Sequence, residues 1–280
     1  MTDTAPHPAI GRTEVAHDRI DLRQARHMQL TLDAAPSFAE GDALPPFWHY
    51  LYFNPQIRAS DLAADGHERL GRFLPDLGLP RRMWAGGRLD WHRPLVLGTQ
   101  ATKTTTIRDI SRKTGRSGAL GFVTVTHDFV DEAGSCFTET QNIVYREAPS
   151  PDAPPPLPRP APQGAEFQRR IDPDPILLFR YSALIFYGHR IHYDADYTRG
   201  VEGYPGLVVH GPLTATLLIG YGMEQAQERP LAAIEIRAIS PLFAPDPFWL
   251  EGAWQDGGLT MWARTESGAL SMLVTLRFTD

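Results

Sequence analysis

A proline-rich segment at residues 149–162, PSPDAPPPLPRPAP, constrains the fold more than any other feature of the sequence. Proline has no backbone N–H and a fixed φ, so this segment can neither enter the interior of a sheet nor continue a helix. Such segments favour extended polyproline conformations and act as semi-rigid connections. We therefore expect two folded halves, residues 1–148 and 166–280, joined by a linker over residues 149–165.

The first half has the pattern of an antiparallel meander. Three runs alternate Thr, Val and Ile with polar residues, and this period of two predicts strands that have one buried face. Helical signal is weak here and limited to residues 59–70, where Ser60 can cap a short amphipathic turn. The strands are expected at residues 101–108, 121–129 and 136–145, with hairpin turns at residues 114–118 and 131–134.

The second half predicts a strand, a helix and then a further meander. An apolar run at residues 176–186 is taken as the strand, and Pro212 opens a helix over residues 213–226. Gly220 and Gly222 keep this apolar helix slim enough for a sheet to wrap it. The later strands are expected at residues 232–240, 248–255, 259–264 and 269–278, with a turn at residues 256–258.

A slim apolar helix followed by antiparallel strands is what a hotdog fold requires, because its sheet curls around one helix. We therefore expect an α+β double hotdog, with two curled antiparallel sheets that each enclose a helix, the helix of the first half being degenerate. Hotdog units pair their sheets side by side, so the chain can form a pseudo-dimer by itself or assemble further as a homodimer. The sequence contains no obvious internal repeat that would prove that the two halves are a pair of hotdog units.

Charge and cysteine content exclude several classes of protein. Lys and Arg number 27 against 33 Asp and Glu, without basic blocks, so we expect no nucleic-acid partner. Cys136 is the only cysteine, which leaves no disulfide framework and no zinc-type cysteine cluster. The first residues lack the basic-then-apolar pattern of a signal peptide, and no apolar run approaches the roughly 20 residues of a membrane span. We expect a cytoplasmic protein without a membrane partner.

Histidines gather in the segment that precedes the helix of the second half. His189, His192 and His210 offer imidazoles, which accept and return protons near neutral pH. Buried histidines that only pack and hydrogen-bond remain the alternative for each of them. A metal held by His189, His192 and Asp194 is a further alternative, which we set aside because cysteine ligands are missing. Ser182 lies in an apolar run without a nucleophile elbow, so we expect a packing serine.

Three longer motifs carry a resemblance to a known family. They are residues 182–194, SALIFYGHRIHYD, residues 203–212, GYPGLVVHGP, and residues 81–88, RRMWAGGR. Together they resemble the MaoC-like, R-specific enoyl-CoA hydratases and type 2 hydroxyacyl-thioester dehydratases, and within these the mesaconyl-C4-CoA and itaconyl-CoA hydratases. The resemblance covers nearly the whole chain. It implies a double hotdog fold, an acyl-CoA thioester substrate and no cofactor apart from the CoA of that substrate.

The resemblance also implies which residues are catalytic. In this family an Asp and a His five positions apart hold and deprotonate the water, and His192 falls on that His. Tyr187 falls where the wider family has Asp and the hydratase subgroup has Asn, while His189 falls where an Asn usually stands. A phenol is a poor base because its pKa lies near 10. Two interpretations stay open: His192 acts alone with Tyr187 positioning, or the site is impaired or retuned.

Further residues are assigned by the same resemblance. The N-terminus of the helix that opens at Gly211 can offer N–H groups to the thioester oxygen. Arginines suit the carboxylate and phosphates of an anionic acyl-CoA. Two rivals remain, which are another hotdog reaction (a thioesterase or an acyl carrier protein dehydratase) and an inactive thioester-binding module. The expected substrate-binding residues are Arg81, Arg82, Arg88, His189, Arg190, Tyr193, Val209 and His210.

Overall fold

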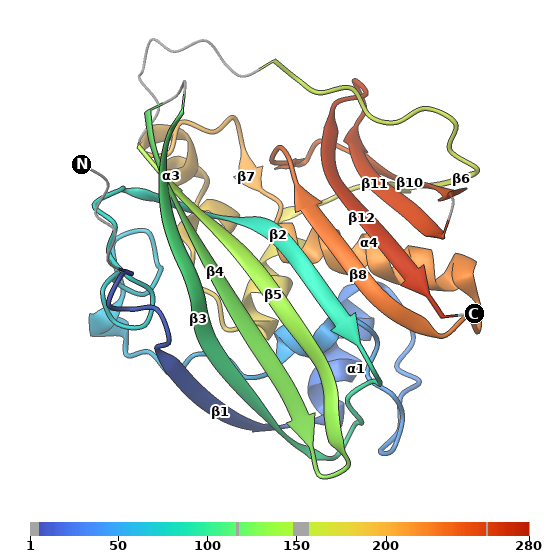
Figure 1. Cartoon of the computed structure of the whole chain (residues 1–280). Helices are drawn as coiled ribbons and strands as arrows, with labels where there is room; N and C mark the ends of the chain where they lie inside the picture. Colours follow the sequence, from blue (N-terminus) through green and yellow to red (C-terminus); the bar gives the residue numbers. More distant parts are fainter. Residues whose placement is uncertain (1–5, 116–117, 148–156, 256, 280) are drawn as a thin grey trace.

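The computed structural model describes residues 6–115, 118–147, 157–255 and 257–279. Ten strands form one antiparallel sheet, in the order β1-β3-β4-β5-β2-β8-β12-β11-β10-β6 (Figure 1). The strands are β1 (Thr13–Arg19), β2 (Arg81–Trp91), β3 (Gln100–Gly115), β4 (Gly118–Asp131), β5 (Gly134–Arg146), β6 (Phe167–Ile171), β8 (Leu231–Ala238), β10 (Phe248–Gln255), β11 (Gly258–Thr265) and β12 (Leu270–Phe278). A separate short pair contains β7 (Leu207–Val208) and β9 (Phe243–Ala244).

The two halves of the chain meet at the pairing of β2 with β8. Strands β1 to β5 come from the first half, and the register of the junction runs from Gly86 opposite Arg237 to Asp90 opposite Ala233. The meanders predicted for both halves are confirmed, because β3, β4 and β5 pair in succession and β10, β11 and β12 do the same. The junction strand β2 itself was not predicted.

The helix predicted in the second half is α4 (Gly211–Ala226), with Pro212 in its first turn. It lies against β10, β11 and β12, which curl around it (Figure 1). A Cβ at Gly222 would lie 2.6 Å from the side chain of Leu276 and 3.1 Å from that of Met261, so an added methyl group would require these buried side chains to shift. Gly220 has open space around it, so it is not needed for the packing.

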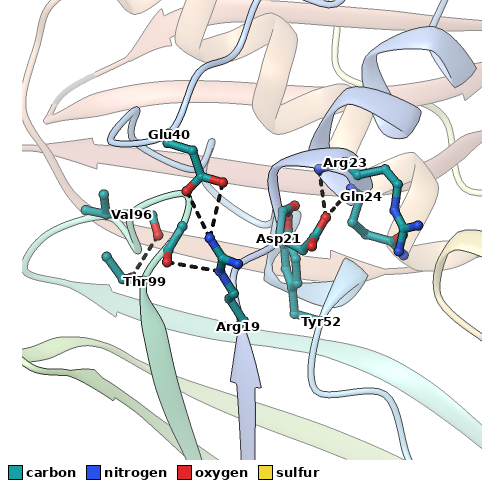
Figure 2. Close-up of polar contacts among 9 residues, drawn as sticks. Arg19, Asp21, Arg23, Gln24, Glu40, Tyr52, Val96 and Thr99 are labelled. Atoms are coloured by element: carbon teal, nitrogen blue, oxygen red, sulfur yellow. Dashed lines mark hydrogen bonds and ion pairs between the residues drawn. The ribbon is translucent and has the colours of Figure 1, made fainter.

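The first half contains a helix that the sequence analysis missed, α1 (Leu22–Thr31). Asp21 caps it, accepting hydrogen bonds from the N–H groups of Arg23 at 2.8 Å and Gln24 at 3.4 Å (Figure 2). Ala25 and Met28 are buried on its inner face. The prediction of helix at residues 59–70 was wrong, since only a 3-10 turn, Ala59–Asp61, occurs there.

The connection from β1 into α1 is fixed by further polar contacts (Figure 2). Arg19 at the end of β1 forms an ion pair with Glu40 at 3.3 Å and donates to the carbonyl of Gly98 at 3.2 Å. The hydroxyl of Tyr52 donates to the carbonyl of Asp21 at 2.8 Å. These bonds tie α1 to the sheet although the helix is short and largely polar.

The apolar run at residues 176–186 is also not a strand. It forms α2 (Pro175–Leu184), whose cap Asp174 accepts from the N–H of Leu177 at 2.7 Å. An apolar run of this length fits a strand or a helix equally well, and the Asp-Pro pair in front of it was the signal that would have decided. Helix α2 packs against α1, so the helices of the two halves touch beneath the shared sheet.

One apolar core runs through both halves. It contains Ile20, Phe47 and Phe137 from the first half and Leu218 and Met261 from the second, all buried. Residues 149–156 of the predicted linker lie outside the described residues. Farther along, the N–H of Ala161 donates to the carbonyl of Gly268 at 3.0 Å, so the end of this segment lies beside the start of β12. No helix in the described parts of the chain is long and apolar enough to cross a membrane.

Candidate active site

The end of α2 directs the histidine segment into the site. Phe186 adopts a left-handed conformation with φ of 49° just after the helix. The N–H of Phe186 donates to Ala183 at 3.3 Å, and that of Tyr187 donates to Ser182 at 2.8 Å. This pattern is a Schellman motif, which usually places glycine at the left-handed position. It ends the helix sharply, so Tyr187 begins a new direction of the chain.

His192 ends the short 3-10 turn Arg190–His192 and is 6% exposed. Its Nδ1 lies 2.7 Å from the carbonyl oxygen of Val208. A carbonyl can only accept, so Nδ1 carries the hydrogen and Nε2 presents its lone pair. No hydrogen bond to this Nε2 occurs among the described residues. Burial lowers the pKa of His192 to about 4, so at neutral pH the ring is a free base.

His210 supports the ring of His192. The two imidazoles stack with centroids 3.6 Å apart and planes 17° from parallel. His210 is 1% exposed, and its Nε2 lies 2.8 Å from the hydroxyl oxygen of Ser182 on α2. Burial holds the pKa of His210 well below its ordinary value. A neutral His210 therefore packs against the neutral His192 ring without placing a positive charge beside it.

A variant of Ser182 tests whether this serine only supports His210 beneath the ring of His192. A Ser182→Ala variant is expected to lose about 1–3 kcal/mol of stability, because the buried Nε2 of His210 would have no partner. Turnover should fall only modestly, since His192 keeps its bond to Val208. Urea unfolding and steady-state kinetics on the same preparation check both values. Complete loss of turnover with unchanged stability would instead point to Ser182 as a nucleophile.

Two residues of the site were missed in the sequence, and both come from the first half. Nδ1 of His67 lies 2.9 Å from the carboxylate of Asp65, and Nε2 of His67 is hydrogen-bonded to the hydroxyl of Tyr187. The backbone N–H of Arg190 donates to the carbonyl of Asp65 at 2.9 Å. The site is therefore built from both halves. The Asp-Gly-His sequence at residues 65–67 was the only local signal for this loop.

His189 lies between the two sets of histidines. Its ring centroid is 3.9 Å from that of His67 and 5.4 Å from that of His192. Burial is the main reason why the pKa of His189 falls to about 2, and the positive charge of Arg82 also lowers it. His189 is therefore neutral and can donate or accept a hydrogen bond in the site.

A metal set of His189, His192 and Asp194 is not assembled. Asp194 instead caps α3 (Ala195–Gly200), where it accepts from the N–H of Tyr197 at 3.0 Å, and it pairs with Arg190. The structure groups His189 with Asp65 and His67, whose possible ligand atoms lie within 4.8 Å of one another. Both ring nitrogens of His67 already have hydrogen-bond partners, so our prediction that the site works without a metal stays in place.

Three of the four predicted arginines are paired with carboxylates. Arg88 is 46% exposed and its partners lie on β2 and β8, so the structure does not bring it to the histidine cluster. Arg190 lies in the 3-10 turn of the histidine segment, and Arg81 begins β2 and pairs with Glu202, which follows α3. The ion pairs are Arg81 with Glu202 at 3.3 Å, Arg88 with Asp90 and with Glu235 at 2.7 Å each, and Arg190 with Asp194 at 2.7 Å.

Arg82 differs from the other three. It forms no ion pair with a carboxylate anywhere in the described ranges. Its positive charge helps to lower the pKa of His189 and opposes the burial that raises the pKa of Tyr187 to about 12. Arg82 thus lies close enough to Tyr187 and His189 to influence both, and its charge also acts on the hydroxyl of Tyr145.

The remaining predicted residues have different positions. Gly211 is the first residue of α4, and a Cβ there would lie 3.2 Å from the ring of Trp84 on β2. The hydroxyl of Tyr193 donates to the carbonyl of Gly188 at 3.0 Å, and its side chain is exposed. Val209 is buried in the core and its N–H donates to the carbonyl of Leu242 at 2.9 Å, so that donor is not available to a substrate.

The buried histidines predict how stability depends on pH. Burial lowers the pKa of His192 and of His127 to about 4, from an ordinary value of 6.5. Between pH 4 and pH 6.5 the unfolded chain binds more protons than the folded one. The free energy of unfolding is therefore highest above pH 6.5 with respect to these two rings, and it falls as the pH drops toward 4. Urea unfolding at pH 7.5, 6.0 and 5.0 should give falling midpoints. Equal midpoints would mean that these rings are not buried as neutral groups.

Together, the sheet that curls around the buried helix α4 and the pairing of β2 with β8 across the two halves define a double hotdog, in which Nδ1 of His192 is held by the carbonyl of Val208. Comparison with known proteins agrees. The family model of hydroxyacyl-thioester dehydratase type 2 matches residues 47–244. A mesaconyl-C(4)-CoA hydratase of Chloroflexus aurantiacus is 43% identical over 271 residues, which is 95% of each chain.

Solved structures support the fold. A MaoC-like dehydratase from Phytophthora capsici superposes with a TM-score of 0.68 at 17% identity, covering 97% of this chain and 96% of that one. A Mycobacterium tuberculosis protein described as a double hotdog gives a TM-score of 0.56 at 14% identity, covering 96% of each chain. The chain belongs to the type 2 hydroxyacyl-thioester dehydratase family and is a hydro-lyase that acts on thioesters. The family resemblance seen in the sequence is confirmed.

Proposed function

We propose that the protein reversibly hydrates a small branched or dicarboxylic enoyl-CoA, with mesaconyl-C4-CoA (3-methylfumaryl-CoA) to citramalyl-CoA as the first candidate and itaconyl-CoA as the second. The observation that carries the proposal is the free lone pair of His192 Nε2, held in place by the bond from Nδ1 to Val208. The 43% identity to a mesaconyl-C(4)-CoA hydratase supports this choice of acyl group. CoA enters as part of the substrate, and no other cofactor is needed.

His192 Nε2 is the proposed base and acid of the reaction. It takes a proton from water while the water oxygen forms a bond to the β carbon of the enoyl thioester. The π electron pair of the double bond moves toward the thioester oxygen and gives an enolate. The α carbon then takes the proton back from His192, so one water has been added and the base is restored. Dehydration follows the same steps in reverse.

The enolate oxygen needs fixed donors, and the N-terminus of α4 is our candidate for them. The helix begins at Gly211, and its first N–H groups have no partners within the helix. The helix dipole favours negative charge at this end. Pro212 has no N–H, so the donors are the N–H groups of Gly211 and Leu213.

Arg82 is proposed to bind the second carboxylate of the substrate. An Arg82→Met variant should lower kcat/KM for mesaconyl-C4-CoA by about 10- to 100-fold, the value of one hydrogen bond to a charged group. The monocarboxylic crotonyl-CoA has no such group, so its kcat/KM should change little. Initial rates are followed by loss of the enoyl-thioester absorbance.

Arg81 provides the matched control for this experiment. It is the neighbour of Arg82, but its guanidinium already pairs with Glu202 at 3.3 Å. An Arg81→Met variant should therefore affect both substrates to the same degree. If Arg82→Met also lowers the rates of both substrates equally, the second carboxylate is bound elsewhere.

Dehydration of a hydroxyacyl thioester is the second candidate function, favoured by the description of the family model. It uses the same site in the opposite direction, and an acyl carrier protein could present the thioester in place of CoA. Turnover of a 3-hydroxyacyl-CoA with no turnover of mesaconyl-C4-CoA would favour it.

For the compartment we retain the cytoplasm as our proposal, since the one cysteine, Cys136, is a buried free thiol.

A further inference from the structure

Tyr187 lies beside His192, the proposed base, and the proposed reaction needs a hydrogen-bond acceptor near that base. Tyr187 precedes His192 by five residues, and their ring centroids are 5.9 Å apart. In hydration the water must direct a lone pair at the β carbon, so the groups around it must accept its two hydrogens. His192 Nε2 accepts one of them. A phenol that donated its own hydrogen to the water would occupy one of the two lone pairs of the water oxygen and make the water a weaker nucleophile.

The loop from the first half decides which way this hydrogen points. Asp65 accepts from Nδ1 of His67 at 2.9 Å and from the backbone N–H of His67 at 3.0 Å. The bond from the His67 ring has the larger effect, and together the two bonds hold the pKa of Asp65 well below its ordinary value. The carboxylate is therefore ionised and can only accept hydrogen bonds. A His67 ring that carries one hydrogen therefore has it on Nδ1. Its Nε2 is a bare acceptor, and the hydroxyl of Tyr187 must donate to it.

We infer that Asp65 and His67 are positioning residues that turn the hydroxyl hydrogen of Tyr187 away from the substrate, so that the phenol oxygen accepts a hydrogen bond from the reacting water. The inference rests on the proposed hydratase function and extends it to a second pair of residues. It also gives Tyr187 a defined role as a neutral acceptor. Burial raises the pKa of Tyr187 to about 12, so the phenol keeps its hydrogen at neutral pH.

The loop is held tightly against the histidine segment. Gly66, between the two positioning residues, has φ of 90°, and a Cβ there would lie 1.9 Å from the carbonyl oxygen of Gly188. Arg190 adds a side-chain bond to the carbonyl of Ala64 at 3.3 Å. His67 is 16% exposed, so solvent has little access to its ring. The contact between the two halves that carries the Asp65 and His67 side chains is thus closely packed.

A double-mutant cycle tests the inference by activity. His67→Leu should lower kcat by about 10-fold or more with little change in KM, because the phenol can then donate to the water. Tyr187→Phe should also lower kcat, and adding His67→Leu to it should have no further effect. His67→Gln should restore part of kcat, since an amide oxygen can accept from Tyr187. Equal losses from His67→Leu in both backgrounds would overturn the inference.

A second readout does not depend on turnover. In the wild-type protein, ¹⁵N NMR of the His67 ring should find the hydrogen on Nδ1, and the shift of Nε2 should change in Tyr187→Phe. Hydrogen on Nε2 would overturn the inference even if the enzyme is active. A stoichiometric metal that is lost together with activity in His67→Leu would also overturn it, in favour of a metal site. A wild-type protein that hydrates no enoyl-CoA would contradict the proposed function, while the ring nitrogens would still decide the direction of the Tyr187 hydrogen.

Discussion

A His192→Gln variant is expected to lose about 10²- to 10⁴-fold in kcat, the usual contribution of one acid-base group. Glutamine can keep a hydrogen bond to Val208 but cannot take and return a proton. The fold should survive, because the side chain stays polar and of similar length. Hydration rates and the far-ultraviolet circular dichroism of the variant measure the two effects separately.

His127 gives a matched control for His192. It is also buried, its pKa is also lowered to about 4, and its Nδ1 bonds to the hydroxyl of Thr105 at 2.9 Å on the sheet of the first half. His127→Gln should therefore change stability and leave kcat close to the wild-type value. Similar kcat values for the two variants would show that loss of packing, and not loss of a proton carrier, explains the effect at His192.

A Gly66→Ala variant is expected to impair both stability and turnover. Its left-handed φ of 90° costs a non-glycine residue about 1–2 kcal/mol, and the Cβ would lie 1.9 Å from the carbonyl oxygen of Gly188. A backbone carbonyl cannot swing aside, so the loop must move, which adds about 1–3 kcal/mol. A shift of about 1 Å in a site can lower kcat about 100-fold. Urea unfolding and kinetics measure both losses.

A Gly71→Ala variant separates the cost of a left-handed backbone from the cost of the Cβ contact. It has φ of 93°, close to that of Gly66, but a Cβ there would meet nothing within 4 Å. Gly71→Ala should therefore lose only the conformational part of the stability and keep full activity. If Gly66→Ala behaves like Gly71→Ala, the contact between the loop and Gly188 does not position the site.

Much of the sheet could be predicted from the sequence because its signals are local. Period-two alternation locates β3, β4 and β5, and Pro212 with helical spacing locates α4. The helices α1 and α2 were missed for a related reason. Residues 22–31 are mostly polar and are held by Asp21 and by packing on α2, whereas the apolar run of α2 has no clear period. In both cases tertiary packing decides that the segment is a helix. The only local sequence signal for each helix is the Asp residue that caps its N-terminus.

The candidate site could be predicted only in part. The segment that contains Tyr187, His189 and His192 is contiguous, so its motif identifies it. His67 lies 120 residues away from Tyr187 in the sequence, and only the docking of the 63–67 turn on Gly188 brings the two together. Arg81, Arg88 and Arg190 pair with carboxylates in the folded chain, whereas Arg82 does not among the described residues. No sequence pattern reveals this difference.

The most direct test of the account is to incubate the purified protein with mesaconyl-C4-CoA and follow the thioester by mass spectrometry. We expect the substrate to gain the mass of one water molecule with the CoA still attached, at a rate that the His192→Gln variant does not support. Release of free CoA would indicate a thioesterase. An unchanged substrate, with crotonyl-CoA and itaconyl-CoA also unchanged, would contradict the account.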